Sequence, residues 1–178
     1  MIVTIIGSRE TPANILETLV NIAAKLMANG HTVRSGAAGG ADETVNTAYH
    51  RNARNGIQQT EPEIFVPWYG FGKEIQGSLK YQIQGSNTEA AKIAEQIHPA
   101  WERCSQGAQK LHTRNVCQIL GADIKTPSDV VLYWCKEQFG KPTGGTATAV
   151  NLASKHKVTT INMLHSNWTE LLDVKLKA

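Results

Sequence analysis

The sequence predicts an α/β fold in which helices cover both faces of an open, parallel sheet of about five or more strands. Short apolar, β-branched runs alternate with segments of helical periodicity, which implies parallel strands joined by right-handed crossovers. The first run, Ile2–Ile6, is short, β-branched and apolar except for Thr4, as is typical of strands that are buried on both faces. With 178 residues and 41% hydrophobic content, the chain is long enough for one buried core and short for two. Residues 1–178 are therefore expected to form a single domain.

The first part of the chain is predicted to contain three strands and two helices. Thr11 is expected to cap the first helix and Pro12 to begin it, because proline is favoured at the first helical position. Asn29-Gly30 is a typical helix end, and Pro67 closes the third strand. In chain order these elements are a strand at 2–6, a helix from 12 up to 29–30, a strand at 31–35, a helix at 41–54 and a strand at 64–66.

Residues 68–110 differ in composition, and we expect a partly helical insertion or lid there. Glycines interrupt this polar segment, and only 88–108 has helical character. The elements expected after it are a helix at 112–120, a strand at 129–134, a helix at 145–155, a strand at 158–161 and a helix near 168–174. The complete pattern predicts a Rossmann-like, doubly wound sheet.

Charge and cysteine content limit the classes of function. Eighteen Lys and Arg against fifteen Asp and Glu give a net charge of +3 without clustering, which permits an anionic ligand but does not indicate a nucleic-acid surface. Three cysteines without a CxxC pair favour a reduced, cytoplasmic setting. The chain shows no signal-peptide pattern and no apolar stretch near the roughly 20 residues that span a bilayer. We expect a soluble protein without membrane contact.

Two glycine-rich turns, Gly36–Gly40 and Thr143–Thr146, each follow a predicted strand and precede a helix. Backbone N–H groups can approach an anion closely there, and the positive end of the helix dipole favours a phosphate. The hydroxyls of the second turn and of Thr148 are further donors. Either turn alone can also reflect tight helix packing, but the presence of two favours phosphate binding. No metal-ligand spacing and no GxxxxGK[ST] sequence is present, so neither a metal nor a cofactor is expected.

Charged residues near these turns have two interpretations each. Arg9, in the turn Gly7-Ser8-Arg9, offers a bidentate fork to a phosphate, or it pairs with Glu10 or Asp42. For Asp42, capping of the helix that follows is favoured over contact with a ribose hydroxyl.

The segment Leu111–Asn115 is expected to open a helix and to place His112 near Arg114. A role in starting or packing that helix is favoured for His112 over catalysis. The aromatic residues of the segment 68–71 are expected to form a local mini-core rather than to stack on a base.

Several of these motifs resemble the SLOG superfamily, which includes the lonely-guy phosphoribohydrolases and the DNA-processing protein A family. Ile5–Arg9 and Ser35–Asp42 are similar to the GSR and SGxAxGxD turns of the DNA-processing proteins. Leu111–Asn115 is similar to the lonely-guy MHERK segment, which places Arg114 on the catalytic arginine, and Gly144–Thr148 is similar to the GGxGT core. The resemblance covers most of the chain outside the insertion and implies a homodimer, and compact chains of this type look like phage-encoded members, acting in the host cytoplasm.

One departure from the lonely-guy pattern concerns the catalytic glutamate, whose position falls on Asn151. An amide cannot act as the carboxylate of N-glycosidic cleavage. Glu137 is the alternative acid. The enzyme class is therefore disfavoured, and Arg114 is its one candidate catalytic residue.

Three functions remain, led by binding or sequestration of a nucleotide-derived ligand such as an ADP-ribose-like or cyclic nucleotide signal. N-glycosidic hydrolysis or transfer on nucleoside monophosphates comes second, and binding of single-stranded DNA comes third because the basic residues are scattered. The candidate ligand-binding residues are Gly7, Ser8, Arg9, Gly36, Ala37, Gly39, Gly40, Asp42, Arg114, Asn115, Thr143, Gly144, Gly145, Thr146 and Thr148.

Overall fold

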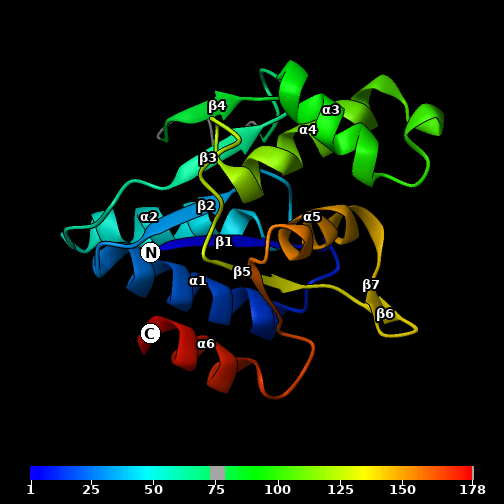
Figure 1. Ribbon diagram of the computed structural model, residues 1–178. Coiled ribbons are helices and arrows are strands. Elements are labelled where there is room, and N and C mark those ends of the chain that lie inside the picture. The colour runs from blue at the N-terminus through cyan, green and yellow to red at the C-terminus, as the bar shows by residue number, and fades with distance from the viewer. Residues whose placement is uncertain (73–78, 178) are drawn as a thin grey trace.

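The computed structural model describes residues 1–72 and 79–177, and within them a six-stranded, fully parallel sheet forms the centre of the molecule (Figure 1). The strands lie in the order β4-β3-β2-β1-β5-β8. They are β1 (Ile2–Gly7), β2 (Thr32–Ser35), β3 (Glu63–Val66), β4 (Tyr81–Ile83), β5 (Val130–Trp134) and β8 (Thr159–Asn162), and a separate antiparallel pair consists of β6 (Glu137–Gln138) and β7 (Lys141–Pro142). The α/β prediction is confirmed.

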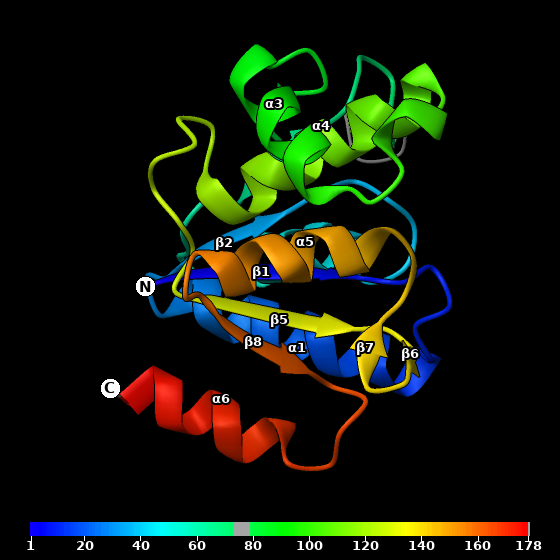
Figure 2. The ribbon, with the colours of Figure 1, turned by 45° about the vertical axis from the view of Figure 1, so that its right-hand side comes forward.

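Helices cover both faces of the sheet, as predicted (Figures 1 and 2). One face carries α1 (Ala13–Ala28), α2 (Glu43–Arg54) and α6 (Trp168–Lys177), and the other carries α3 (Thr88–Ile97), α4 (Gln106–Leu120) and α5 (Gly144–Lys155). The central strands supply side chains to two separate cores: Val3 and Ile5 pack on the first face, and Ile6 packs on the second. Since side chains alternate along a strand, the mostly apolar run of β1 contributes to both cores, and the hydroxyl of its buried Thr4 is satisfied by the Gln118 carbonyl at 2.6 Å.

The predicted insertion contributes to this architecture. β4 pairs in parallel with β3 and becomes the edge strand of the main sheet, and α3 packs on α4. Of the segment 68–110, residues 73–78 lie outside the described residues.

Two helix boundaries in this region differ from the prediction. The helix expected over 88–108 ends at Ile97, because Pro99 lacks the N–H group that would continue it and disfavours helical backbone at the residue before it. After the short 3-10 turn Trp101–Arg103, α4 begins at Gln106 with Ser105 as its cap. The segment Leu111–Asn115 therefore lies inside α4 and does not open a helix.

The start of α1 also differs from the prediction. Pro12 is the N-cap of this helix and makes no side-chain capping bond. The hydroxyl of Thr11 donates to the Ser8 carbonyl at 2.6 Å, so it closes the turn after β1 instead of capping α1.

The strand order creates a crevice beside β1. From β1 the chain builds β2, β3 and β4 on one side, and then crosses back to place β5 and β8 on the other. In open parallel sheets, ligands bind outside the carboxyl ends of the strands at such a switch point. None of the helices in 1–72 and 79–177 has the length and apolar character that crossing a membrane requires.

Candidate functional site

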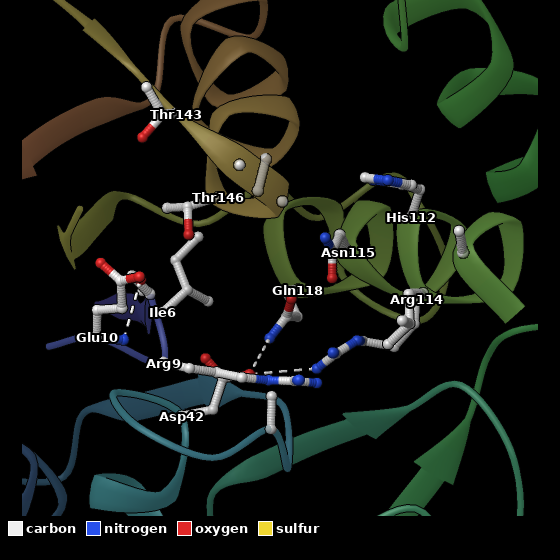
Figure 3. A pocket seen from close by; sticks show the side chains of 18 residues that line it. Ile6, Arg9, Glu10, Asp42, His112, Arg114, Asn115, Gln118, Thr143 and Thr146 are labelled. Carbon is white, nitrogen blue, oxygen red and sulfur yellow. Dashed lines mark hydrogen bonds and ion pairs between the residues drawn. The ribbon is translucent and has the colours of Figure 1, made fainter. Parts of the chain in front are cut away.

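A cavity of about 390 Å³ lies at the carboxyl ends of β1 and β5, where the switch point places it (Figure 3). Its walls come from four parts of the chain: the turn after β1, the segment between β2 and α2, helix α4 and the start of α5. The predicted site residues that line it are Gly7, Ser8, Arg9, Asp42, Arg114, Asn115, Thr143, Gly144, Gly145 and Thr146. Folding thus brings most of the predicted site together.

The start of α5 faces this cavity without a side-chain cap. Asn87 caps α3 and Ser105 caps α4 through their side chains, whereas Thr143, the N-cap residue of α5, makes no such bond, as is also the case at the starts of α1 and α2. Its hydroxyl donates to the Lys136 carbonyl at 2.9 Å instead. The N–H groups in the first turn of a helix have no partner inside the helix, so those of α5 are available to an anion in the cavity.

The two glycines of this turn are not required by packing against the described residues. A Cβ at Gly144 or at Gly145 would meet no described atom within 4 Å. Gly144 has φ +70°, which favours glycine, whereas Gly145 has no such constraint. Neither packing nor backbone conformation requires glycine at position 145, and the absence of a side chain there leaves open space at the cavity.

Asp42 and Arg114 form a buried ion pair on the cavity wall. Arg114 Nη1 lies 3.3 Å from Asp42 Oδ2, and the two side chains are 4% and 6% exposed. The same Nη1 atom donates to the Phe65 carbonyl at 3.3 Å. Burial raises the pKa of Asp42, an effect that the Arg114 charge opposes, and burial lowers the pKa of Arg114. The capping role favoured for Asp42 is wrong, since its carboxylate faces Arg114 and makes no cap bond to α2.

The Gln118 amide lies between Asp42 and Asn115, and Figure 3 draws it in the orientation whose nitrogen faces Asp42. Turning the amide over extends the network to Asn115. With its oxygen toward the Gly36 N–H (2.8 Å) and Arg114 Nη1 (3.2 Å), its nitrogen donates to Asn115 Oδ1 (3.0 Å). In the orientation drawn in Figure 3, the amide nitrogen makes one 3.4 Å contact with Asp42 Oδ2 and faces two other donors, the Gly36 N–H and Arg114 Nη1. The turned orientation therefore satisfies more hydrogen bonds. Gln118 was not among the residues expected at the site, and its spacing of four from Arg114 on α4 is the signal that could have found it.

The first glycine-rich turn lies beside the cavity, and only Ala38 from it belongs to the lining. A Cβ at Gly36 would overlap the Arg114 guanidinium and would lie 2.8 Å from its Cζ atom. A Cβ at Gly40 would lie 2.7 Å from the Ser8 carbonyl oxygen, and φ at Gly40 is +92°. The lining therefore does not include the other predicted residues of this turn, which are Gly36, Ala37, Gly39 and Gly40. Close packing explains why Gly36 and Gly40 are glycines.

Arg9 extends from the end of β1 along the cavity (Figure 3). The alternative partners considered for it are engaged elsewhere: Glu10 pairs with Lys136 at 2.7 Å, and Asp42 pairs with Arg114. Burial of Arg9 is slight, so its guanidinium remains accessible to a ligand.

Four other predicted features lie outside the cavity lining. Thr148 is buried, and Asn151 is exposed on α5. Glu137 bonds to Asn162 (2.9 Å) and His165 (3.0 Å) at a different cavity, so it does not replace the family glutamate in the site. The expected aromatic mini-core forms in part: Trp68 and Phe71 pack edge to face at 5.2 Å, whereas Tyr69 is 79% exposed and takes no part in it.

His112 lies on the cavity wall in the second turn of α4. Burial, together with the charges of His98 and Arg114, lowers the pKa of His112 to about 4, so the ring is neutral at pH 7. Its ring centroid lies 4.3 Å from that of His98, and Cys104 is close to both residues. The sequence spacing did not indicate this cluster.

No protein-family model, curated protein or solved structure matches this chain. The fold and the geometry of the cavity are therefore the basis on which its function is inferred.

Proposed function

We propose that this protein binds the phosphate-bearing part of a nucleotide-derived ligand in the cavity between β1, α4 and α5. The observation that carries the proposal is the start of α5, where uncapped N–H groups and an unconstrained glycine face a cavity that also holds an accessible arginine. A phosphate meets these requirements because it has several acceptor oxygens and a negative charge.

The convergence of separate motifs supports SLOG membership as part of the proposal. The motifs that resemble the superfamily include Gly7-Ser8-Arg9, Arg114 and Gly144-Gly145, and all three contribute to the lining of one cavity. In the sequence, Gly7 and Gly145 are 138 positions apart. A ligand that contacts all of them would extend across the switch point.

We favour holding the ligand over cleaving it. Among the described residues, the cavity wall holds two carboxylates, and each is paired: Asp42 with Arg114 and Glu10 with Lys136. Asn151 and Glu137 lie away from the lining. A hydrolase that forms an oxocarbenium-like transition state needs a carboxylate that is free to face the sugar.

The proposal is tested by calorimetric titration of the purified chain with nucleoside mono-, di- and triphosphates, ADP-ribose and cyclic nucleotides. We expect one of these classes to bind, and Gly145→Asp to weaken that binding by at least about tenfold, because it places a carboxylate beside the phosphate. An acidic residue in the first turn stabilises a helix, so this change should leave the fold intact.

Gly39→Asp is the matched control, because Gly39 is also exposed, also has no positive φ and would also meet no described atom within 4 Å. Its binding should stay within about threefold of the unsubstituted protein. The proposal is wrong if no class binds the unsubstituted protein, or if Gly145→Asp binds as tightly as Gly39→Asp.

Cleavage is distinguished from binding by incubating the bound nucleotide with the protein and separating the products by chromatography. We expect the nucleotide to be recovered unchanged. Release of the free base would instead favour the phosphoribohydrolase class.

A further inference from the structure

We propose that His98, Cys104 and His112 bind a zinc ion beside the cavity. One ligand atom from each residue lies within 4.8 Å of the others. The cluster joins the end of α3, the segment after the 3-10 turn and the second turn of α4. This proposal does not depend on the proposed nucleotide binding, and its test reads the metal directly.

The separation of sulfur and nitrogen in the cluster is close to that of a tetrahedral zinc site. Cys104 Sγ lies 3.7 Å from His98 Nδ1 and 3.8 Å from Nε2. Zn–S and Zn–N bonds of about 2.3 and 2.0–2.1 Å at a tetrahedral angle place sulfur and nitrogen about 3.5 Å apart. Because the sulfur is almost equally far from both ring nitrogens, the His98 ring must rotate to point one of them at the ion.

The ligand atoms have few competing interactions. His112 Nδ1 is buried and has no hydrogen-bond partner among the described residues. His98 Nδ1 already presents a lone pair, since it accepts the Ala100 N–H at 3.2 Å, and the Cys104 thiol makes a long 3.6 Å contact to the Ala100 carbonyl. A metal would replace these two local contacts and would give His112 the partner that it lacks.

The donor set selects the type of metal. Imidazole nitrogen and thiolate sulfur favour zinc and related transition metals over magnesium or calcium, which prefer oxygen. Binding releases the Cys104 thiol proton to solvent, and the thiolate offsets one charge of the ion. Three protein ligands leave a fourth position for water or an oxygen of a ligand, and His112 is the ligand residue that also lines the cavity.

Cobalt(II) titration of the chelator-treated full chain tests the site, because thiolate coordination to cobalt gives a charge-transfer absorption. We expect saturation at one cobalt per chain and displacement by zinc. Zinc at about a hundred times its Kd should raise the thermal midpoint by about 5–10 °C. Cys104→Ser should remove the charge-transfer absorption, and His98→Asn and His112→Gln should weaken binding at least about tenfold.

His156→Gln is the control, since His156 is exposed at the end of α5 and should leave cobalt binding unchanged. Circular dichroism confirms that each variant is folded. If Cys104→Ser does not fold, the weakened cobalt binding of His98→Asn carries the test. The proposal is overturned if the unsubstituted protein shows no charge-transfer absorption, if the absorption persists in Cys104→Ser, or if His156→Gln weakens binding as much as His112→Gln.

Discussion

The two glycine-rich turns of this chain have the same position after a parallel strand, but their glycines have different physical causes. In the turn 36–40, a Cβ at Gly36 or Gly40 would lie within 2.8 Å of other protein atoms. In the turn 143–146, a Cβ at Gly144 or Gly145 would meet no described atom within 4 Å. Close packing thus requires glycine at positions 36 and 40 of the first turn, whereas in the second turn Gly144 is favoured by its positive φ and neither glycine is required by packing.

The close packing of the first turn helps to build the cavity wall. Gly36 has no side chain, which allows the Arg114 guanidinium to reach Asp42 and the Gly36 N–H to reach Gln118. The first turn therefore supports the cavity wall, whereas we propose that the second contacts the ligand. This division leads to three further predictions about stability and binding.

The largest effect is expected from Arg114→Ala, which leaves the Asp42 carboxylate buried without its partner. The free energy of unfolding, measured by urea denaturation, should fall by about 3–5 kcal/mol. Arg9→Ala is the control, because Arg9 is exposed at the same cavity and its loss should change stability by no more than about 0.5 kcal/mol. A loss below about 1 kcal/mol in Arg114→Ala would show that the buried pair does not stabilise the wall.

A smaller effect is expected from adding one methyl group to each turn. Gly36→Ala should lower the free energy of unfolding by about 1–3 kcal/mol, because its Cβ overlaps Arg114. Gly145→Ala should change it by no more than about 0.5 kcal/mol, since its Cβ enters open space. Equal losses in the two variants, measured under the same denaturation conditions, would contradict the distinction between the turns.

The smallest effects should separate two hydroxyls of the second turn. Thr146 lines the cavity, and Thr146→Val should weaken ligand binding by about five- to tenfold through the loss of one hydrogen bond. The Thr143 hydroxyl is engaged with the Lys136 carbonyl, so Thr143→Val should lower stability by about 0.5–1.5 kcal/mol and leave binding within about threefold. Calorimetry with the nucleotide that binds the unsubstituted protein measures both values, and a greater loss of binding in Thr143→Val would reverse the assignment.

Sequence patterns predicted most elements of the fold because the signals are local. The apolar runs at 2–6 and 129–134 became the central strands β1 and β5, and the turns after β1 and before α5 did reach one cavity. β4 was missed because it has only three residues, and Gln82 and Ile83 are exposed, so it lacks the apolar run of a central strand. The start of α4 was misplaced because only eight residues separate the end of α3 at Ile97 from Gln106, and periodicity alone does not divide two helices that lie so close in sequence. The capping residue Ser105 was the signal that marks the boundary.

The sequence by itself determined the alternation of strands and helices, the burial of the central strands and the position of the glycine turns, because each depends on residues that are neighbours in the chain. Only the tertiary structure decided which side chains meet. Asp42 pairs with Arg114 across 72 residues, and α3 and α4 bring His98, Cys104 and His112 together. Such contacts depend on how helices pack on the sheet, and no local periodicity records that packing.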